Sequence, residues 1–228
     1  MGFFFWDWTV LLLIPALILG LWAQAKVSSS FKKYSKVRSR QGYTGAQVAR
    51  YLLDGAGLND VAIERVGGRL SDHYDPRARV LRLSDGVYAS PSLAAIGVAA
   101  HETGHALQHS EGYLPLGVRN AVFPVARIGS WAFMPTFLLG LFFHSQMGIL
   151  LDVGIMLFTF YVFFTVVTLP VEFNASRRAL QMLTQTGYLS DEEVGGARSV
   201  LSAAAMTYVA GALMAILNFL RLLILRDR

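Results

Sequence analysis

The sequence predicts an α-helical membrane protein with a small α+β domain, and three observations lead to this fold class. Hydrophobic residues make up 54% of the 228 residues, which is more than an ordinary soluble domain contains. About four apolar stretches are predicted to span a bilayer, at residues 3–23, 128–143, 149–169 and 204–225. Between the first two stretches the chain becomes more polar, and helix-like and strand-like patterns there predict the α+β domain.

The first span is predicted to be an anchor and not a cleaved signal peptide, because no basic segment precedes it. Trp6, Trp8 and Trp22 lie near its two ends, where tryptophan favours the membrane interface. Basic residues without any acidic one follow it, namely Lys26, Lys32, Lys33, Lys36, Arg38 and Arg40. By the positive-inside rule this flank is cytoplasmic, and its charges indicate membrane orientation and not nucleic-acid binding.

Residues 44–53 predict a short amphipathic helix that Thr44 caps, with Val48, Tyr51 and Leu52 on its inner face. Residues 61–66 and 78–84 predict two strands, because turn residues separate these two apolar segments. We expect the strands to form a short antiparallel sheet. An extended substrate could add to the exposed edge of the second strand, as peptides commonly do.

A helix predicted over residues 91–110 carries His101, Glu102 and His105, with Ser90 as its cap and Pro91 in its first turn. Residues four apart share a helix face, so both histidines lie on one side. In a His-Glu-x-x-His helix the imidazoles bind zinc and the carboxylate takes a proton from water. The chain has no cysteine, so histidine and carboxylate must hold the metal, as in a zincin-like catalytic domain.

A catalytic zinc needs a third protein ligand, and five residues are candidates for it. Glu111 and His109 follow the motif on the same helix, although His109 is rotated away from the direction of His101. His73 lies in the strand region, and the predicted topology puts His144 on the opposite membrane face. Glu172 follows a pair of spans that returns the chain to the cytoplasmic side. Glu172 is therefore favoured, and Glu111, His73 and His109 stay open as alternatives.

The rest of the chain is predicted to be a membrane hairpin, two polar helices and a last span. Pro170 is expected to end the third span, and Ser190 with Glu193 forms a capping box for a helix over residues 190–203. Three arginines at the far end of the last span run against the positive-inside rule, namely Arg221, Arg226 and Arg228. The predicted segments are residues 1–25 (first span), 26–127 (zincin-like domain), 128–169 (hairpin), 170–203 (helices with the third ligand) and 204–228 (last span).

The segments HETGHALQH at 101–109 and LPVEFNASRRA at 169–179, with the four spans and the chain length, resemble the YugP-type neutral zinc metallopeptidase family of bacterial membranes. The layout is similar to that of membrane gluzincins related to HtpX and to the CAAX prenyl protease. The resemblance implies a zinc-dependent, membrane-embedded endopeptidase. It further implies that His101, His105 and Glu172 are the zinc ligands and that Glu102 is the general base.

One position departs from the related pattern. In the HtpX relatives an aspartate four residues after the ligand glutamate orients a ligand histidine, and here Ser176 stands there, with Asn174 nearby. We therefore expect Asn174, Ser176 or backbone groups to orient the ligands. The expected hydrogen-bond donor to the oxyanion has four candidates, and these are Tyr74, Tyr88, His73 and Arg178.

Together with the resemblance, which implies a bacterial membrane, these patterns predict a multi-pass protein of the inner (plasma) membrane that holds one Zn²⁺ on or near the cytoplasmic side. Its expected substrates are membrane proteins or peptides near that leaflet, and a regulatory membrane partner or a homo-oligomer is a further class of partner. The alternative is a non-catalytic zinc-binding scaffold or adaptor. Glu102 argues against it, because a structural zinc site is usually closed by a fourth ligand and needs no base.

Overall fold

The computed structural model of the chain describes residues 7–68, 70–143 and 147–227. Trp6, His144 and Arg228 lie outside these residues. The chain forms two compact units, and unit 1 consists of Met1–Ala23, Pro115–Pro170 and Thr207–Arg228. Unit 2 consists of Gln24–Leu114 and Val171–Met206, and it contains the sheet and the His-Glu-x-x-His helix. The five predicted segments stay a prediction.

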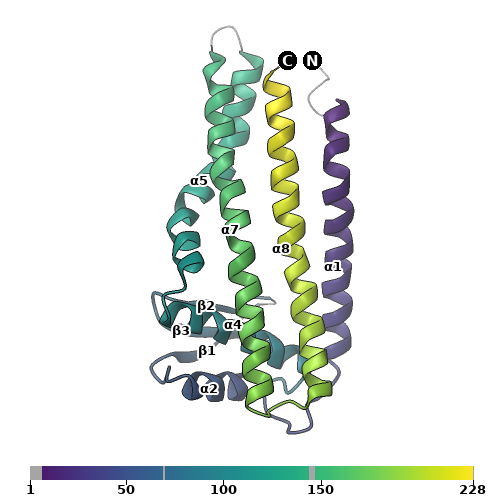
Figure 1. Ribbon diagram of the computed structural model, residues 1–228, viewed down its shortest axis with the longest axis vertical. Coiled ribbons are helices and arrows are strands. Elements are labelled where there is room, and N and C mark those ends of the chain that lie inside the picture. Colours follow the sequence, from purple (N-terminus) through teal and green to yellow (C-terminus); the bar gives the residue numbers. More distant parts are fainter. Residues whose placement is uncertain (1–6, 69, 144–146, 228) are drawn as a thin grey trace. The chain divides into compact units, whose positions relative to one another are not determined.

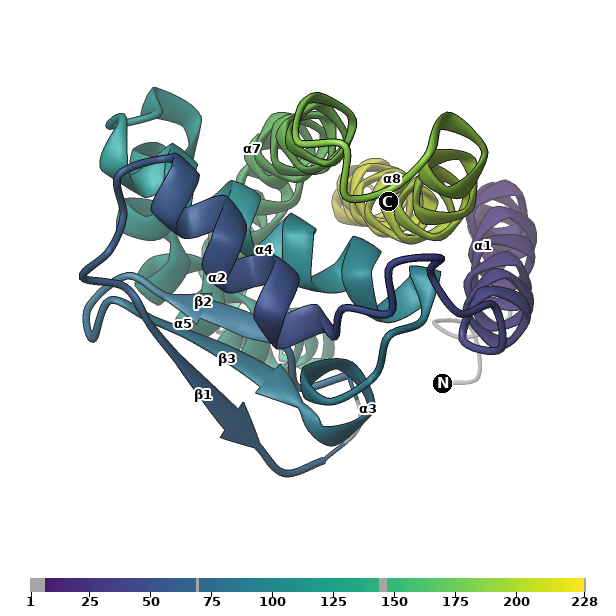
Figure 2. The same cartoon turned by 90° about the horizontal axis from the view of Figure 1, so that it is seen from below.

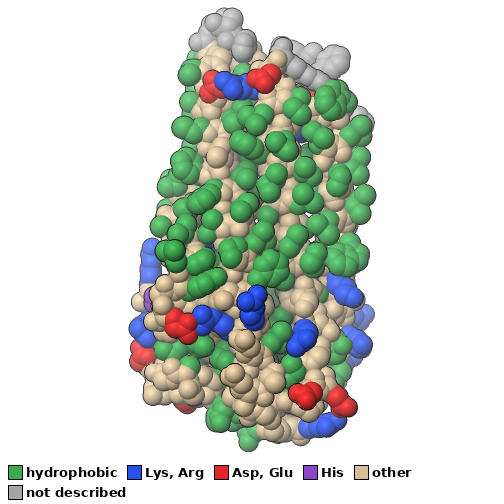
Figure 3. All heavy atoms as spheres, viewed as in Figure 1, with side chains coloured by type: hydrophobic (Ala, Val, Ile, Leu, Met, Phe, Trp, Pro, Cys, Tyr) green, Lys and Arg blue, Asp and Glu red, His purple; other side chains and the backbone are tan. Residues whose placement is uncertain are grey.

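Four helical segments are long and apolar enough to cross a membrane, which confirms the predicted fold class. The first is a 3₁₀ segment, η1 (Trp8–Leu13), which continues into α1 (Ile14–Tyr34). The others are α5 (Leu114–Phe142), α7 (Ile149–Gln185) and α8 (Asp191–Arg226). Within unit 1 these helices run side by side (Figure 1), and hydrophobic side chains cover their visible face (Figure 3).

The helices run further than the sequence predicted. Pro170 does not end the third span, because α7 continues through it to Gln185. The two predicted elements after residue 190 are likewise one helix, α8, which the predicted capping box of Ser190 and Glu193 begins. A proline removes one backbone hydrogen bond, and the neighbouring turns of a long helix can keep their own bonds. The site residues on α7 are therefore carried by a continuation of a membrane helix.

In unit 1, two of the arginines that conflict with the positive-inside rule have partners. Arg221 is buried, and its Nε donates a hydrogen bond to Thr9 Oγ1 at 3.2 Å. Arg226 Nε lies 2.6 Å from Asp152 Oδ1 in an ion pair. These two contacts join α8 to η1 and to α7 within the unit.

The sheet of unit 2 has three strands in the order β1-β3-β2, namely β1 (Ala62–Val66), β2 (His73–Asp75) and β3 (Val80–Ser84). The two predicted strands, β1 and β3, are parallel with Ala62 opposite Val80, so the expected antiparallel pairing was wrong. The reason is β2, which sequence reasoning missed and which pairs antiparallel with β3. β1 and β2 therefore lie at opposite edges of β3. β3 is therefore central, and the expected free edge for a substrate does not exist there.

Two helices pack on this sheet, α2 (Gly45–Gly55) and α4 (Leu93–Ser110), with the short helix α3 (Asp85–Tyr88) before α4 (Figure 2). Thr44 caps α2 as predicted, and Val48 and Leu52 are buried, but Tyr51 is 46% exposed. The cap of α4 is Ser92 and not the expected Ser90, since Ser92 Oγ accepts a hydrogen bond from the Ala95 N–H. The motif helix thus begins two residues later than predicted.

Small residues let α4 approach α7 and α8 closely in unit 2. A Cβ on Gly104 would lie 2.6 Å from the carbonyl oxygen of Ala175, and a Cβ on Gly97 would lie 3.3 Å from Cβ of Ala197. Around these contacts a buried cluster joins Ile96 and other residues of α4 to residues of α7 and α8. The backbone of α4 therefore packs directly against α7 at the turn between His101 and His105.

We expect Gly104→Ala to lower the free energy of unfolding by about 1–3 kcal/mol, because the added methyl group meets backbone and not a movable side chain. Gly195→Ala in α8 is the matched control, since no atom lies within 4 Å of a Cβ there. This control is expected to be neutral or stabilising by up to about 1 kcal/mol. Thermal unfolding of both variants in detergent measures the difference, and equal midpoints would contradict the close packing.

Candidate metal centre

Three side chains of unit 2 converge on one point. His101 and His105 lie one turn apart on α4, and Glu172 projects from α7. Glu172 Oε2 lies 3.3 Å from His101 Nε2 and 3.7 Å from His105 Nε2. The three possible donor atoms are all within 4.8 Å of one another, and this is the only group of three metal-binding side chains found among the described residues.

The outer nitrogen of each imidazole has a partner of its own. Ser176 Oγ lies 3.1 Å from His101 Nδ1, so the predicted orienting role of Ser176 has a geometric basis. Gln108 Oε1 lies 2.9 Å from His105 Nδ1 and can only accept, so Nδ1 of His105 must carry the proton. In its neutral form, the one that binds a metal, the His105 ring then presents the lone pair of Nε2 toward Glu172.

Gln108 also joins α4 to α7, and sequence reasoning missed it as a site residue. Its side chain is fully buried, and Nε2 donates to the Val171 carbonyl at 2.8 Å and to Asn174 Oδ1 at 2.9 Å. Arg178 Nε donates to the same Asn174 oxygen at 2.7 Å. The signal that could have identified Gln108 is its position three residues after His105, on the same helix face.

Glu102 lies beside the three converging side chains and is oriented by the edge strand β2. Its Oε2 accepts a hydrogen bond from the backbone N–H of Tyr74 at 3.1 Å. The Tyr74 hydroxyl lies 3.0 Å from Nδ1 of His109, which follows Glu102 by about two turns of α4. Tyr74 therefore contacts α4 at two points. Its backbone N–H engages one carboxylate oxygen of Glu102, and the other carboxylate oxygen takes no part in this hydrogen bond.

The other candidates for the third ligand have different contacts. Glu111 pairs with Arg178 Nη2 at 2.7 Å, and His109 contacts Tyr74. His73 Nδ1 lies 2.7 Å from the Ser71 carbonyl oxygen. The structure thus brings Glu172 to the two imidazoles. It does not bring Glu111, His109 or His73 to them.

The candidate oxyanion donors lie in different surroundings. Tyr74 and Arg178 are linked to groups of the centre, through Glu102 and through Asn174 respectively. Tyr88 packs against the hydrophobic cluster of α2, β3 and α4, and His73 contacts Ser71. The contacts of these four residues do not single out one of them as the hydrogen-bond donor to the oxyanion, so this prediction stays open.

The charges around the centre shift several pKa values. Burial of the His105 ring acts to lower its pKa, but the carboxylates of Glu172 and Glu102 outweigh burial and raise it above its usual value. Burial raises the pKa of the Tyr74 hydroxyl. The hydrogen bond from Arg178 lowers the pKa of Glu111, which keeps this carboxylate ionised. The carboxylates thus create a negative local potential that favours a cation beside His105.

The residues fit a zinc ion by the chemistry of their donor atoms. Two imidazoles and one carboxylate form a known catalytic zinc set with an open position for water. Both imidazoles have their outer nitrogens engaged, which is the arrangement that orients zinc-binding histidines. A hard cation such as Mg²⁺ would prefer oxygen donors only, so the donor set favours zinc.

The chain is similar to known proteins over most of its length. Residues 9–227 match the model of a family described as "Putative neutral zinc metallopeptidase". The chain is 50% identical over 212 residues, 93% of each chain, to a Bacillus subtilis (strain 168) protein named "Putative membrane protease YugP". No solved structure matches the chain. With the four apolar helices, this similarity identifies a membrane protein.

We expect Gln108→Leu to weaken zinc binding by about 10- to 100-fold, because His105 loses the acceptor that fixes its orientation. Gln108→Glu keeps an acceptor for His105 Nδ1 but weakens the link to α7, so its zinc affinity should fall less. Gln24→Leu replaces an exposed glutamine of α1 and is the matched control. Zinc competition titrations of the three variants test this order, and an unchanged affinity in Gln108→Leu would contradict it.

Proposed function

The chain belongs to the neutral zinc metallopeptidase family, and from this premise we propose that it is a membrane-embedded zinc endopeptidase. His101, His105 and Glu172 hold one zinc ion in this proposal, and Glu102 is the general base. The observation that carries it is the convergence of the two Nε2 atoms on Glu172 Oε2 while the outer ring nitrogens are engaged.

When zinc is bound, it supplies a Lewis acid that acidifies water and polarises the scissile carbonyl group. Glu102 accepts a proton from the attacking water, whose oxygen forms a bond with the carbonyl carbon. Glu102 then passes this proton to the leaving nitrogen as the C–N bond breaks, which gives an acid and an amine. The Tyr74 N–H holds Oε2 of Glu102, so the other carboxylate oxygen carries the proton.

The proposed substrates are membrane proteins or peptides near the cytoplasmic leaflet of the bacterial inner membrane. Basic residues support this orientation, because Lys26, Lys32 and Lys33 follow the first span and Arg177 and Arg178 follow the hydrophobic part of α7. These residues belong to unit 2, which also contains the metal centre. A site on the same side as these basic residues would act on segments that emerge into the cytoplasm.

We expect Glu102→Gln to lower peptide hydrolysis by about 100- to 10,000-fold while zinc stays bound, because the amide cannot accept the proton. Glu172→Gln should lose both zinc and activity, because a metal-binding carboxylate is removed. Glu64→Gln is the control, since Glu64 is an exposed glutamate of β1 that pairs with Arg82. Each full-length variant is purified in detergent. The measurements are its zinc content and the rate at which it cleaves casein.

Each outcome distinguishes a part of the proposal. Equal cleavage by the wild type and Glu102→Gln would overturn the role of the base. Full zinc content in Glu172→Gln, with loss of zinc in Glu111→Gln, would transfer the third ligand to Glu111. Zinc binding in the wild type without cleavage of any tested membrane protein or peptide would favour the scaffold function.

A further inference from the structure

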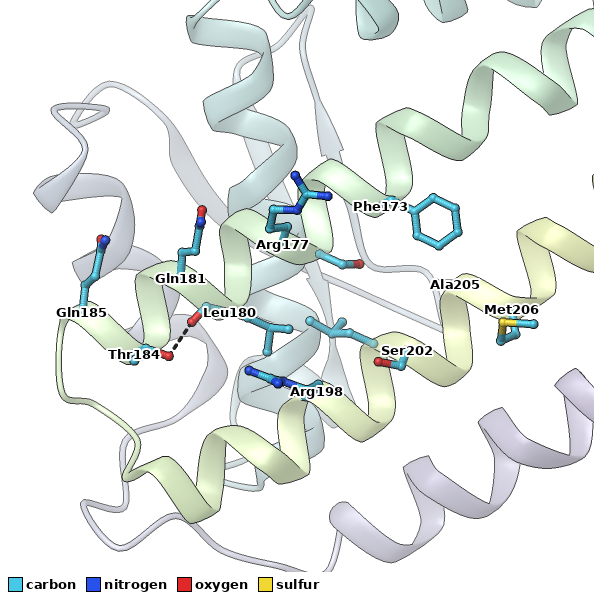
Figure 4. A pocket seen from close by; sticks show the side chains of 12 residues that line it. Phe173, Arg177, Leu180, Gln181, Thr184, Gln185, Arg198, Ser202, Ala205 and Met206 are labelled. Atoms are coloured by element: carbon cyan, nitrogen blue, oxygen red, sulfur yellow. Dashed lines mark hydrogen bonds between the residues drawn. The ribbon is translucent and has the colours of Figure 1, made fainter.

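A groove between α7 and α8 in unit 2 has no role in the proposed reaction. Twelve side chains of these two helices line it, and its volume is about 670 Å³, which is within the usual range of ligand sites (Figure 4). We call it the α7–α8 groove. It extends from Phe173 and Met206 at one end to Gln185 and Arg198 at the other.

The polarity of the α7–α8 groove changes along its length. Phe173, Ala205 and Met206 form one end, and the apolar segments of α7 and α8 begin next to these residues in the chain. The other end carries polar side chains, among them Gln181 and Thr184 (Figure 4). An apolar end that adjoins membrane-spanning segments and a polar end are complementary to an amphiphile.

The groove is also positively charged. Arg177 lies on its α7 wall and Arg198 on its α8 wall, and neither forms an ion pair with any described residue. None of the twelve lining side chains is acidic. One cationic side chain on each wall of the groove, with no ion-pair partner among the described residues, favours an anionic ligand.

The groove lies behind the metal centre and not at its reactive side. Ser176 lines the groove and also contacts Nδ1 of His101, whereas Nε2 of the same ring faces Glu172. The two nitrogens are on different sides of the imidazole ring. A ligand in the groove would therefore not occupy the position of a peptide under attack, which argues for a lipid and against a substrate.

We propose that the α7–α8 groove binds one anionic phospholipid, with its phosphate between Arg177 and Arg198 and its acyl chains along Phe173 and Met206. The inference does not depend on proteolysis, because the groove residues that hold the phosphate take no part in the reaction. The lipid would fix the spacing of α7 and α8, and Ser176 connects the groove to His101.

The test is native mass spectrometry of the zinc-loaded full chain in neutral detergent, titrated with phosphatidylglycerol or phosphatidylcholine. The wild type should bind one phosphatidylglycerol with saturation and prefer it to phosphatidylcholine. Arg177→Gln with Arg198→Gln should weaken this binding about tenfold or more, because both cations near the phosphate are lost. Arg177→Lys with Arg198→Lys keeps both positive charges and should retain most of the phosphatidylglycerol binding.

Two further variants serve as controls. Lys32→Gln with Lys36→Gln removes the same charge from exposed positions of unit 2 outside the groove and should bind like the wild type. Ser202→Trp keeps both arginines but fills the groove from α8, and should also weaken binding. Equal zinc content and unfolding midpoints verify that each variant is folded.

Equal phosphatidylglycerol affinity in the wild type and the double glutamine variant would overturn the proposal. An equal loss in the two-lysine control would also overturn it, because it would indicate attraction by net charge only. If the double glutamine variant binds lipid like the wild type but no longer binds an acidic peptide that the wild type binds, the groove is a peptide site instead.

Discussion

The buried carboxylate of Glu172 between two imidazoles is the interaction on which the rest of the structure depends. Its side chain is 7% exposed, and a buried carboxylate is costly unless cations or hydrogen-bond donors compensate it. Two features of unit 2 bring it to α4. The helix α7 continues past Pro170 without a break, and Gly104 allows the backbones of α4 and α7 to touch. Gln108 then fixes the contact, because its amide bonds to both helices in a fully buried position. The sheet contributes through β2, where the Tyr74 N–H donates a hydrogen bond to Glu102.

Features encoded within a few residues were predictable from the sequence. The motif helix, the Thr44 cap and the Ser190–Glu193 capping box depend on neighbours in the chain, and the structure contains all three. Glu172 was favoured from chain order and charge, since a membrane hairpin had to return it to the side of the motif. The ambiguity between Ser90 and Ser92 as the cap of α4 was local too, because both serines suit that position and only the backbone conformation selects Ser92.

Features that depend on distant residues were not predictable. The parallel pairing of β1 with β3 depends on β2, whose three residues give too short a pattern to recognise. Pro170 looked like a helix end, and packing of α7 in both units overrides that local preference. The importance of Gln108 comes from the Val171 carbonyl and Asn174, more than sixty residues away, as its hydrogen bonds show. In unit 1, Arg221 and Arg226 looked like a topological conflict until Thr9 and Asp152 were found beside them.

The central claim is that two imidazoles of α4 and one carboxylate of α7 share a zinc ion. Anomalous diffraction at the zinc absorption edge, from crystals of the zinc-loaded full chain, tests it most directly. The account predicts one anomalous peak at about 2.0–2.2 Å from Nε2 of His101, from Nε2 of His105 and from a carboxylate oxygen of Glu172. The remaining position should hold a water molecule near Glu102. A peak that Glu172 does not contact, or one closed by a fourth protein ligand, would contradict the account.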